Sequence, residues 1–499
     1  MAPPLDHHHV AAHRRRPPLH PLERWLLGVL IVVLLWLPWA FAGVYSWVQI
    51  PAAVLAAVAL GLALVTRRYA DELAPGGDFT LVMWPRLVRF PLFWLGLGLL
   101  VLLVVQAFNP AWERHEVGTA WWLTPKEHIT WLPQSAPGPF LWMNVWREFI
   151  IYAGVWLAVC AAWVGFTRRR SLQILVGTIV GNGVLLAVVG MVHRATRPNP
   201  ENWLWTDRTF FGGGTPFASF VYQNHGGMFV ALVAGGAAAL AAWHWSEARK
   251  RMSRSNPGGV WLIGLAVLGL ASAVSGSRGA TLSFSAFAVA AVGAYLYLRR
   301  FSPVRSTTPA IVGVAVALLF VGVFAFFVRH ADLGEVSRKL EMFSKQGAVE
   351  ASYQSRTEVR EVAWRMYEDY WLLGSGAGSF RWVFMGYLEK LPEDAGIRQA
   401  FWDHTHCDWL EIPIELGLPG VLLIGGAFGW LMVVFVRHRG WRHPVALFVL
   451  LGCGQTLAHA YFDFPFQAPS ILMTWWILLV AAIRWLELEA GGSGAGAER

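Results

Sequence analysis

Long apolar runs recur along the whole chain and are separated by short polar connections. A run of about 18 or more apolar residues is long enough to cross a bilayer as a helix. The pattern therefore predicts an all-α, polytopic integral membrane protein with about twelve transmembrane helices and one long extracytoplasmic loop. The expected spans are 25–44, 48–65, 90–108, 149–166, 172–192, 226–245, 260–274, 280–298, 310–328, 419–436, 445–462 and 470–486.

The polar connections predict the orientation of the spans. Arginine and lysine gather on alternate connections, which the positive-inside rule assigns to the cytoplasm. Both termini are then cytoplasmic, and the longest polar connection, 329–418, lies on the opposite side. The basic clusters are at 14–16, 67–68, 168–170, 249–251, 299–300 and 437–442.

These boundaries divide the chain into five regions. They are a disordered cytoplasmic tail at 1–24, N-terminal transmembrane helices at 25–328, the extracytoplasmic loop at 329–418, C-terminal transmembrane helices at 419–488 and a cytoplasmic tail at 489–499. Ala40-Phe41-Ala42 resembles a signal-peptidase site, but the first apolar run is long for a signal peptide, so we expect it to remain uncleaved.

The long loop contains two recognisable elements. Val359, Val362, Ala363, Met366 and Tyr370 form an apolar stripe with helical spacing. The glycine-rich stretch 374–380 follows, and it lacks the Lys-Ser/Thr of a phosphate-binding loop. We interpret it as a tight turn or a backbone contact surface.

The composition narrows the classes of function. Hydrophobic residues make up 56% of the chain and charged residues 14%, against roughly a quarter charged in soluble domains. The net charge of +9 lies mostly in short clusters between spans, which predicts contact with membrane lipid and no binding of nucleic acid. Cys160 and Cys453 lie in apolar spans, so we expect no disulfide framework.

Titratable side chains gather immediately before one span, in DHTHCDWLEIPIELGLPG at 403–420. Histidine is the side chain best suited to exchange a proton near neutral pH, so His406 is the candidate base of an enzyme that acts on a lipid-carried substrate. The plainer alternative is a histidine satisfied by hydrogen bonds at a helix entrance. His404 and His406 could share a metal ion only on an extended segment, and no third ligand follows at a familiar spacing. We therefore expect no metal and no cofactor.

Six motifs in the second half of the chain resemble the bacterial O-antigen ligase and O-antigen polymerase superfamily. Their order and their expected side of the membrane both match. The motifs are YQNHGGMF at 222–229, SGSRGA at 275–280, SRTEV at 355–359, GSGAGSF at 374–380, HCDWLEIPIELGLPG at 406–420 and AHAYFDFPFQAP at 458–469.

The resemblance implies a metal-independent, inverting glycosyltransferase of the bacterial inner membrane with a periplasmic active site. Such an enzyme moves a glycan from an undecaprenyl-diphosphate carrier to an acceptor hydroxyl. Ligases use lipid A-core as acceptor, and polymerases of O-antigen or exopolysaccharide use another glycan chain. The family's essential histidine matches His406, and its diphosphate-binding arginines match Arg278 and Arg356. Guanidinium groups suit the charge of a leaving diphosphate, although Arg278 could instead reach to the interface and Arg356 could be a solvated or structural ion pair.

Several polar residues on the same expected face are candidates for supporting roles. Tyr222, Asn224 and His225 could bind sugar or cap the helix that they begin, and Asn224 suits a cap. His459 and Asp463 could pair across one helical turn. Glu411 and Glu415 are one helical turn apart, and Glu415 could hold the histidine loop or a sugar, with structural anchoring the preferred interpretation. The remaining candidates are His404 and Asp408.

Two observations leave alternatives open. Cys407 stands where the family usually has asparagine, which raises thiol chemistry as a minor option. A small-anion membrane transporter is the alternative from another class, but it would favour ionisable residues at mid-membrane, whereas the candidates here gather at one face.

Overall fold

The structure is a computed structural model that describes residues 19–69, 79–196, 202–203, 206–207, 215–253, 255–301, 346–392 and 396–494. The expected span 310–328, residues 1–18 of the predicted N-terminal tail and residues 495–499 of the predicted C-terminal tail lie outside the described residues.

The other expected spans are helices in the structure. Nine helices within the described residues are long and apolar enough to cross a membrane, and α8 and α15 are shorter apolar helices. The predicted all-α polytopic membrane fold is therefore confirmed. The helices are α1 (Pro21–Trp39), α2 (Ser46–Leu64), α4 (Pro91–Phe108), α5 (Val145–Gly165), α6 (Arg169–Thr196), α7 (Gln223–Lys250), α8 (Gly258–Val274), α9 (Arg278–Arg299), α14 (Asp408–Arg437), α15 (Pro444–His459) and α16 (Pro469–Gly494).

Short elements connect these helices. Three antiparallel hairpins pair β1 (Arg67–Tyr69) with β2 (Phe79–Leu81), β3 (Trp112–Val117) with β4 (Ala120–Pro125), and β5 (Asn202–Trp203) with β6 (Thr206–Asp207). The remaining helices are the 25-residue α12 (Gln346–Tyr370) and the short η1 (Phe41–Gly43), α3 (Trp84–Val88), α13 (Phe380–Leu388), η3 (Gly396–Gln399), η4 (Gly440–Arg442) and η5 (Pro465–Gln467).

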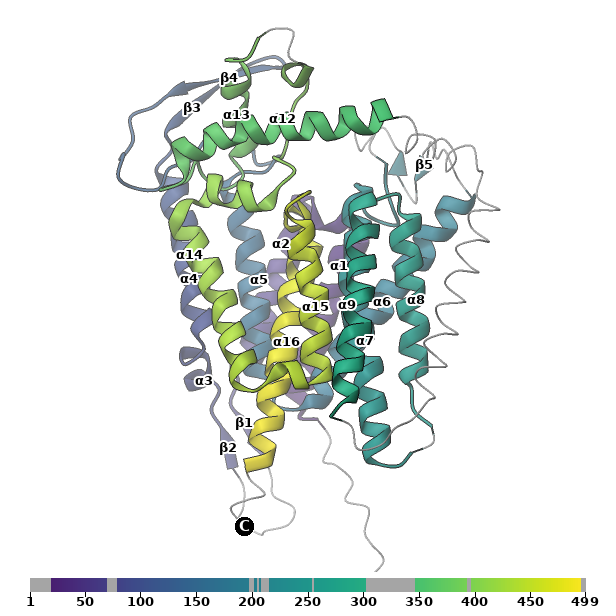
Figure 1. The fold of residues 1–499 in the computed structure, drawn as a ribbon. Helices are drawn as coiled ribbons and strands as arrows, with labels where there is room; N and C mark the ends of the chain where they lie inside the picture. Colours follow the sequence, from purple (N-terminus) through teal and green to yellow (C-terminus); the bar gives the residue numbers. More distant parts are fainter. Residues whose placement is uncertain are drawn as a thin grey trace, which may run out of the picture.

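The long helices run side by side (Figure 1), and α7 is the most deeply buried of the nine membrane-length helices among the described residues. In its most apolar stretch 89% of the α7 residues are buried, against 6% for α9. Small residues let the backbones approach closely. A Cβ built on Gly235 of α7 would lie 2.7 Å from the Cα of Gly452 in α15. Close packing through glycine is a usual way to associate helices in lipid, where no hydrophobic force drives them together.

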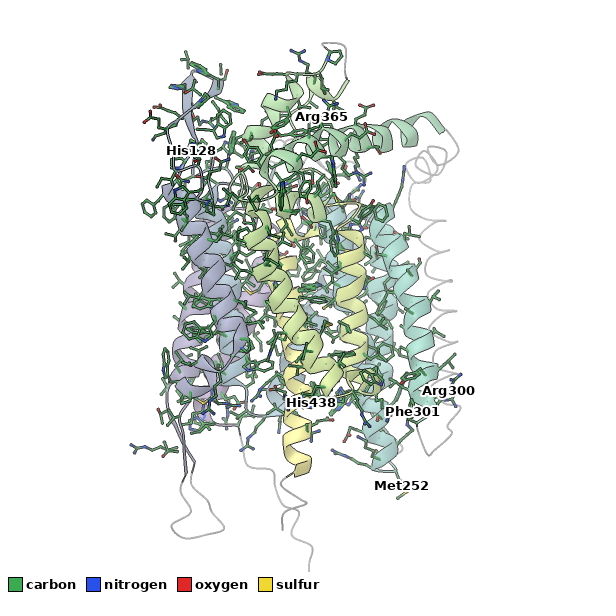
Figure 2. All side chains as sticks on the ribbon, turned by 60° about the vertical axis from the view of Figure 1, so that its left-hand side comes forward. His128, Met252, Arg300, Phe301, Arg365 and His438 are labelled. Atoms are coloured by element: carbon green, nitrogen blue, oxygen red, sulfur yellow. The ribbon has the colours of Figure 1, made fainter. Side chains whose placement is uncertain are left out.

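The two ends of the bundle differ in character. β1, β2 and the C-terminal end of α16 lie at one end, whereas β3, β4, α12 and α13 form a cap at the other (Figure 1). Figure 2 places Met252, Arg300 and His438 at the first end and His128 and Arg365 at the capped end. The basic connections therefore lie together, opposite the cap.

The cap is built on the predicted helical stripe. Val359, Val362, Ala363 and Met366 of α12 are all at most 4% exposed and pack in one cluster with α13 and the start of α14. α12 lies across the end of the bundle (Figure 1). The cap thus covers the ends of the transmembrane helices that carry the candidate residues.

One predicted boundary is wrong. The expected span 419–436 is the second part of α14, which already begins at Asp408 and bends at Gly417, where φ is 61°. Leu418 N–H donates to Trp371 O at 2.8 Å, outside the helix ladder. The Gly417-Leu418-Pro419 sequence marks this bend, but polar side chains before it obscured the helix. Asp408, Glu411 and Glu415 therefore project from helical turns.

Candidate functional site

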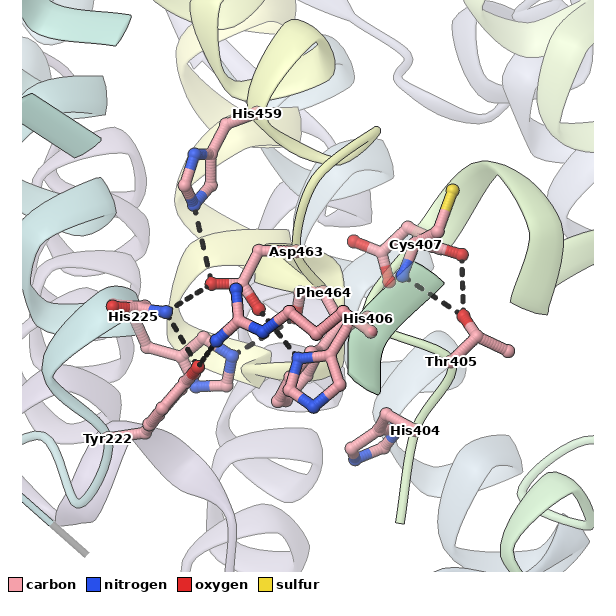
Figure 3. Close-up of polar contacts among 12 residues, drawn as sticks. Tyr222, His225, His404, Thr405, His406, Cys407, His459, Asp463 and Phe464 are labelled. Atoms are coloured by element: carbon pink, nitrogen blue, oxygen red, sulfur yellow. Dashed lines mark hydrogen bonds and ion pairs between the residues drawn. The ribbon is translucent and has the colours of Figure 1, made fainter. Parts of the chain in front are cut away.

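A buried carboxylate, Asp463, lies at the centre of the polar residues that the sequence singled out. It stands between α15 and η5, and its side chain is 3% exposed. Its Oδ1 lies 3.4 Å from His406 Nδ1. Its Oδ2 accepts a hydrogen bond from Asn224 Nδ2 at 2.6 Å and lies 3.7 Å from His459 Nε2 (Figure 3). Residues from the start of α7, the histidine loop and the end of α15 thus meet at one carboxylate.

The surroundings keep Asp463 ionised. Burial by itself would raise the pKa of this carboxyl group. The adjacent His406 and His459 rings and the charge of Arg356 outweigh burial and hold the pKa well below its usual value. A buried carboxylate that is satisfied by donors can only accept hydrogen bonds.

The ionised Asp463 determines the tautomer of His406. Because the carboxylate can only accept, His406 Nδ1 carries the proton, and Nε2 of the neutral ring then has a free lone pair. Within the described residues, Nε2 has no hydrogen-bond partner, and the side chain is 18% exposed. His406 also has φ of 55°, a left-handed conformation that costs a non-glycine residue about 1–3 kcal/mol and persists only where the surroundings enforce it.

Neighbouring contacts enforce that conformation. His404 Nδ1 lies 2.6 Å from Glu411 Oε1, and Thr405 N–H donates to Glu411 Oε2 at 2.7 Å. The Thr405 hydroxyl also bonds both the N–H and the C=O of Cys407. Burial lowers the pKa of His404, but the charge and hydrogen bond of Glu411 reverse that effect and raise it overall. Glu411 on the first turns of α14 therefore clamps both residues that precede His406.

Phe464 packs its ring against four other rings of the site. Its ring stacks on Tyr222 at 5.4 Å and on His404 at 4.5 Å between centroids, and it meets the edges of His225 and His406 at 4.9 and 4.8 Å. Its carbonyl oxygen also lies 3.1 Å from His225 Nε2. One aromatic ring thus sets the positions of four others.

These side chains enclose a cavity of about 420 Å³. His404, His406, Tyr222, His225 and Phe464 face it from one group of elements. Its remaining lining residues are Ala42, Val44, Val221, Phe401, Trp402 and Asp403. Its size falls within the range of ligand-binding cavities, and it combines aromatic walls with a few convergent polar groups.

Tyr222 and Asn224 connect the cavity to Arg356. Asn224 Nδ2 donates to the Tyr222 hydroxyl at 2.6 Å, and an Arg356 guanidinium nitrogen donates to the same hydroxyl at 3.3 Å. Burial raises the pKa of Tyr222 far above its usual value, so the phenol stays protonated. The interpretation of Asn224 as a helix cap is wrong, because Tyr222 occupies the N-cap position and Asn224 turns its amide to Asp463.

Arg278 begins α9 beside this cluster. A Cβ built on the next residue, Gly279, would lie 2.5 Å from the ring of His459, so the start of α9 packs directly on the histidine that faces Asp463. Arg278 is exposed, and Ser277 caps its helix by accepting from Ala280 N–H. Arg356 therefore reaches the Asp463 cluster through Tyr222, whereas the residue next to Arg278, Gly279, is the one that packs on His459.

Glu415 lies away from the cavity and holds the glycine-rich turn. Its two oxygens accept the N–H groups of Gly378 and Phe380, each at 2.9 Å. Gly376 has φ of 107°, and a Cβ on it would lie 2.5 Å from the Cα of Ser135. The turn is therefore a backbone contact surface that encloses a carboxylate of the chain itself.

Asp408 and Cys407 also have structural surroundings. Asp408 Oδ2 accepts Phe466 N–H at 2.9 Å, and its own N–H donates to Ala460 O at 2.9 Å, which ties α14 to the loop that carries Asp463. Cys407 is 5% exposed in the apolar cluster under α12. Burial raises the pKa of its thiol, and the sulfur points away from His406 (Figure 3).

The sequence analysis missed Phe464 and Arg194. Phe464 lies inside the motif that was quoted for its neighbour Asp463. Arg194, in the last turn of α6, donates to Gln223 Oε1 and to Ser275 O, both at 2.9 Å. A basic residue at the end of a span predicted to face away from the cytoplasm was the available signal for Arg194.

Metal-ligating side chains do not form a site within the described residues. No group of three or more His, Cys, Asp or Glu side chains there has an arrangement that could hold an ion. The residues around Asp463 instead make hydrogen bonds to one another.

Comparison with known protein families matches part of the chain. Residues 263–425 match the family model described as O-Antigen ligase. No curated protein matches the chain. The matched segment includes Arg278, Arg356 and His406. Tyr222, which contacts Arg356, and Asp463, which contacts His406, lie outside it. The match over residues 263–425 supports the resemblance to the O-antigen ligase and polymerase superfamily that the six motifs indicate.

Proposed function

We propose that the protein transfers a glycan from a polyprenyl-diphosphate carrier to an acceptor hydroxyl at the extracytoplasmic face of the bacterial inner membrane, as an O-antigen ligase does. The observation that carries this proposal is the pairing of His406 with ionised Asp463 at the wall of the 420 Å³ cavity. That pairing leaves a proton-accepting nitrogen directed away from the carboxylate.

His406 activates the acceptor. A sugar hydroxyl is a weak nucleophile, and Nε2 takes its proton as the oxygen attacks the anomeric carbon of the donor glycan. The glycan–phosphate C–O bond breaks, and its electron pair stays on the carrier diphosphate. Asp463 stabilises the imidazolium that forms and holds the ring in the required orientation. No metal ion takes part in this scheme, and attack opposite the diphosphate inverts the anomeric centre.

Arg356 and Arg278 bind the diphosphate of the donor. A guanidinium group offers several fixed donors to phosphate oxygens and stays cationic at every relevant pH. Arg356 already touches the Tyr222 hydroxyl at the cavity wall. Arg278 begins a helix, whose N-terminal dipole adds to its positive charge. Together they compensate the charge that develops on the leaving group.

The acceptor approaches along the part of the cavity that directly precedes the histidine loop in the chain. Phe401, Trp402 and Asp403 line the cavity there. Arg381 holds this wall by pairing with Asp403 at 2.9 Å and by stacking on Phe401 at 5.3 Å. A polymerase of O-antigen or exopolysaccharide would use the same cavity with another glycan as acceptor.

The test measures glycan transfer by His406→Gln and Arg356→Gln in a strain that lacks the endogenous protein. Matched controls are His128→Gln and Arg365→Gln, because both residues lie at the same end of the bundle, where His128 is partly exposed and Arg365 is exposed (Figure 2). We expect a loss of about 10²–10⁴-fold for His406→Gln and a raised requirement for donor in Arg356→Gln. Activity equal to the controls at equal protein level contradicts the proposal. The length of the glycan and the identity of its acceptor distinguish a ligase from a polymerase.

A further inference from the structure

A second, larger cavity lies at the end of the bundle opposite the candidate site. Its volume is about 840 Å³. One wall is the beginning of α6 with Arg168, Arg169 and Arg170, and the other is the end of α7 with His244 and Arg251. The rest of the lining is Leu19, Thr167, Gln173, Trp243, Glu247, Ala248, Ser253, Ser255, Asn256, Pro257 and Leu488.

The cavity has a strongly positive lining. Four guanidinium groups face one carboxylate, Glu247, among its described lining residues. Glu247 lies 2.9 Å from Lys250 Nζ and 3.3 Å from an Arg251 nitrogen, and the charge of Arg169 also acts on it, so this single carboxylate cannot offset four guanidinium groups. Arg169 pairs with Glu489 at 2.6 Å but remains 44% exposed. The positive charge of Arg168 and Arg170 lies on the same wall.

The connection that carries the arginines at the start of α6 is held in place by a buried carboxylate. Glu23 of α1 is fully buried and accepts hydrogen bonds from Thr167 N–H at 3.1 Å, from the Ser171 hydroxyl at 2.5 Å and from Arg67 at 3.0 Å. These bonds fix the connection between α5 and α6 on both sides of the arginine cluster. The guanidinium groups therefore stand on a rigid backbone, which lowers the entropy cost of binding an anion.

The position of the cavity indicates where its ligand comes from. Its lining residues Arg251 and Ser253 flank Met252, which stands at the same end of the bundle as Arg300 and His438 (Figure 2). Trp243, Leu19 and Leu488 supply an apolar part of the lining, and the guanidinium groups supply the polar part. Basic pockets between transmembrane helices on this side of a membrane suit phosphate headgroups, and apolar walls suit the start of acyl chains.

We propose that this cavity binds the headgroup of an anionic phospholipid from the adjacent leaflet, a phosphatidylglycerol or cardiolipin type of ligand. Arg170 and Arg251 hold the phosphodiester from opposite walls, and Trp243 packs on the glycerol backbone. The site is separate from the glycan-transfer site, and it stands whether or not that proposed function is correct.

The test uses the purified full-length protein with mixed micelles that contain phosphatidylglycerol, cardiolipin or phosphatidylcholine. Lipid binding is measured by native mass spectrometry and by the shift in melting temperature. Each basic side chain near the membrane surface contributes about 1 kcal/mol to the binding of anionic lipid. The double variant Arg170→Gln/Arg251→Gln is therefore expected to weaken this binding about 30-fold. The matched control is Arg299→Gln/Arg300→Gln, which removes two charges at the same end but outside the cavity lining.

A second variant tests whether the cavity itself is needed for lipid binding. Ala248→Trp places a large side chain in the cavity and leaves every charge in place, and it should also lose the bound lipid. Equal weakening in the cavity and control variants would show general attraction to a basic surface and would overturn the proposal. So would equal binding of phosphatidylcholine. Stabilisation by inorganic phosphate alone, to the same extent as by lipid, would replace the lipid with a free anion.

Discussion

The most informative perturbation of the candidate site is Asp463→Asn, because it preserves shape and changes one atom. Asp463 now accepts from His406 on one oxygen and from Asn224 on the other. An asparagine at this position has a single oxygen. Asn224 donates at 2.6 Å and His406 lies at 3.4 Å, so the shorter bond retains the oxygen and the new NH₂ group turns towards His406 Nδ1.

The expected loss of activity follows from the change in the tautomer of His406. In this variant His406 Nδ1 faces the NH₂ group of the amide at position 463 and must accept its hydrogen bond. The ring proton therefore moves to Nε2, which can then no longer act as a base. Loss of a general base typically costs about 10²–10⁴-fold in rate. We therefore expect Asp463→Asn to fall in that range. In a His406→Gln background it should cause little further loss, because the two residues act as a unit.

A reciprocal exchange separates catalysis from packing. In Asn224→Asp/Asp463→Asn the carboxylate at 224 accepts the NH₂ group at 463, which returns the amide oxygen to His406 Nδ1. The original tautomer is restored, so we expect the double variant to be at least about tenfold more active than Asp463→Asn alone.

The assay follows transfer of a labelled glycan from a polyprenyl-diphosphate donor to membrane acceptors, with purified variants at equal concentration. Melting temperatures are measured in parallel. The reasoning is refuted if Asp463→Asn stays within threefold of the wild type, or if the double variant is no better than the single one while both are folded.

Three further outcomes are expected. Gly376→Ala should markedly lower the melting temperature, because φ is 107° at this position and the new Cβ would lie 2.5 Å from a backbone atom. Gly386→Ala has nothing within 4 Å of the new Cβ and should stabilise α13 by about 0.5–1 kcal/mol. Equal melting temperatures of the two variants would contradict this account. Cys407→Ala should keep activity within about twofold because its thiol is buried and protonated, and a folded but inactive variant would indicate thiol chemistry. Glu411 raises the pKa of His404 in the folded state, so this pair stabilises fully below the ordinary value of about 6.5. That stability is lost as pH rises through the raised pKa, and melting curves of His404→Gln should lack this part of the pH dependence.

Much of the fold was predictable from sequence because membrane spans carry a strong local signal. Uninterrupted apolar runs must form helices in lipid, where every backbone group needs an internal partner. The alternation of basic connections then brings their ends together at one side. Where the signal was mixed, as at 408–418, polar side chains hid a helix that continues into the apolar run.

The candidate site was predictable only as a set of residues. His406 and Asp463 are recognisable by type and expected side, and the hypothesis of a histidine base stays a prediction. The roles of Asn224 and Glu415 could not be assigned, because each depends on a partner far away in the chain. Asn224 bonds a carboxylate 239 residues later, and Glu415 bonds a turn 35 and 37 residues earlier.

The sequence alone determined the membrane character, the positions of most helices and the face on which titratable side chains gather, because hydrophobicity and charge act locally. Only the tertiary structure decided that Asp463 faces His406, that Phe464 joins four rings and that the arginines at the other end line a cavity. Those facts depend on which helices are neighbours and at what height they meet. Helical periodicity sets the face of a side chain but carries no information about the helix that will lie against it.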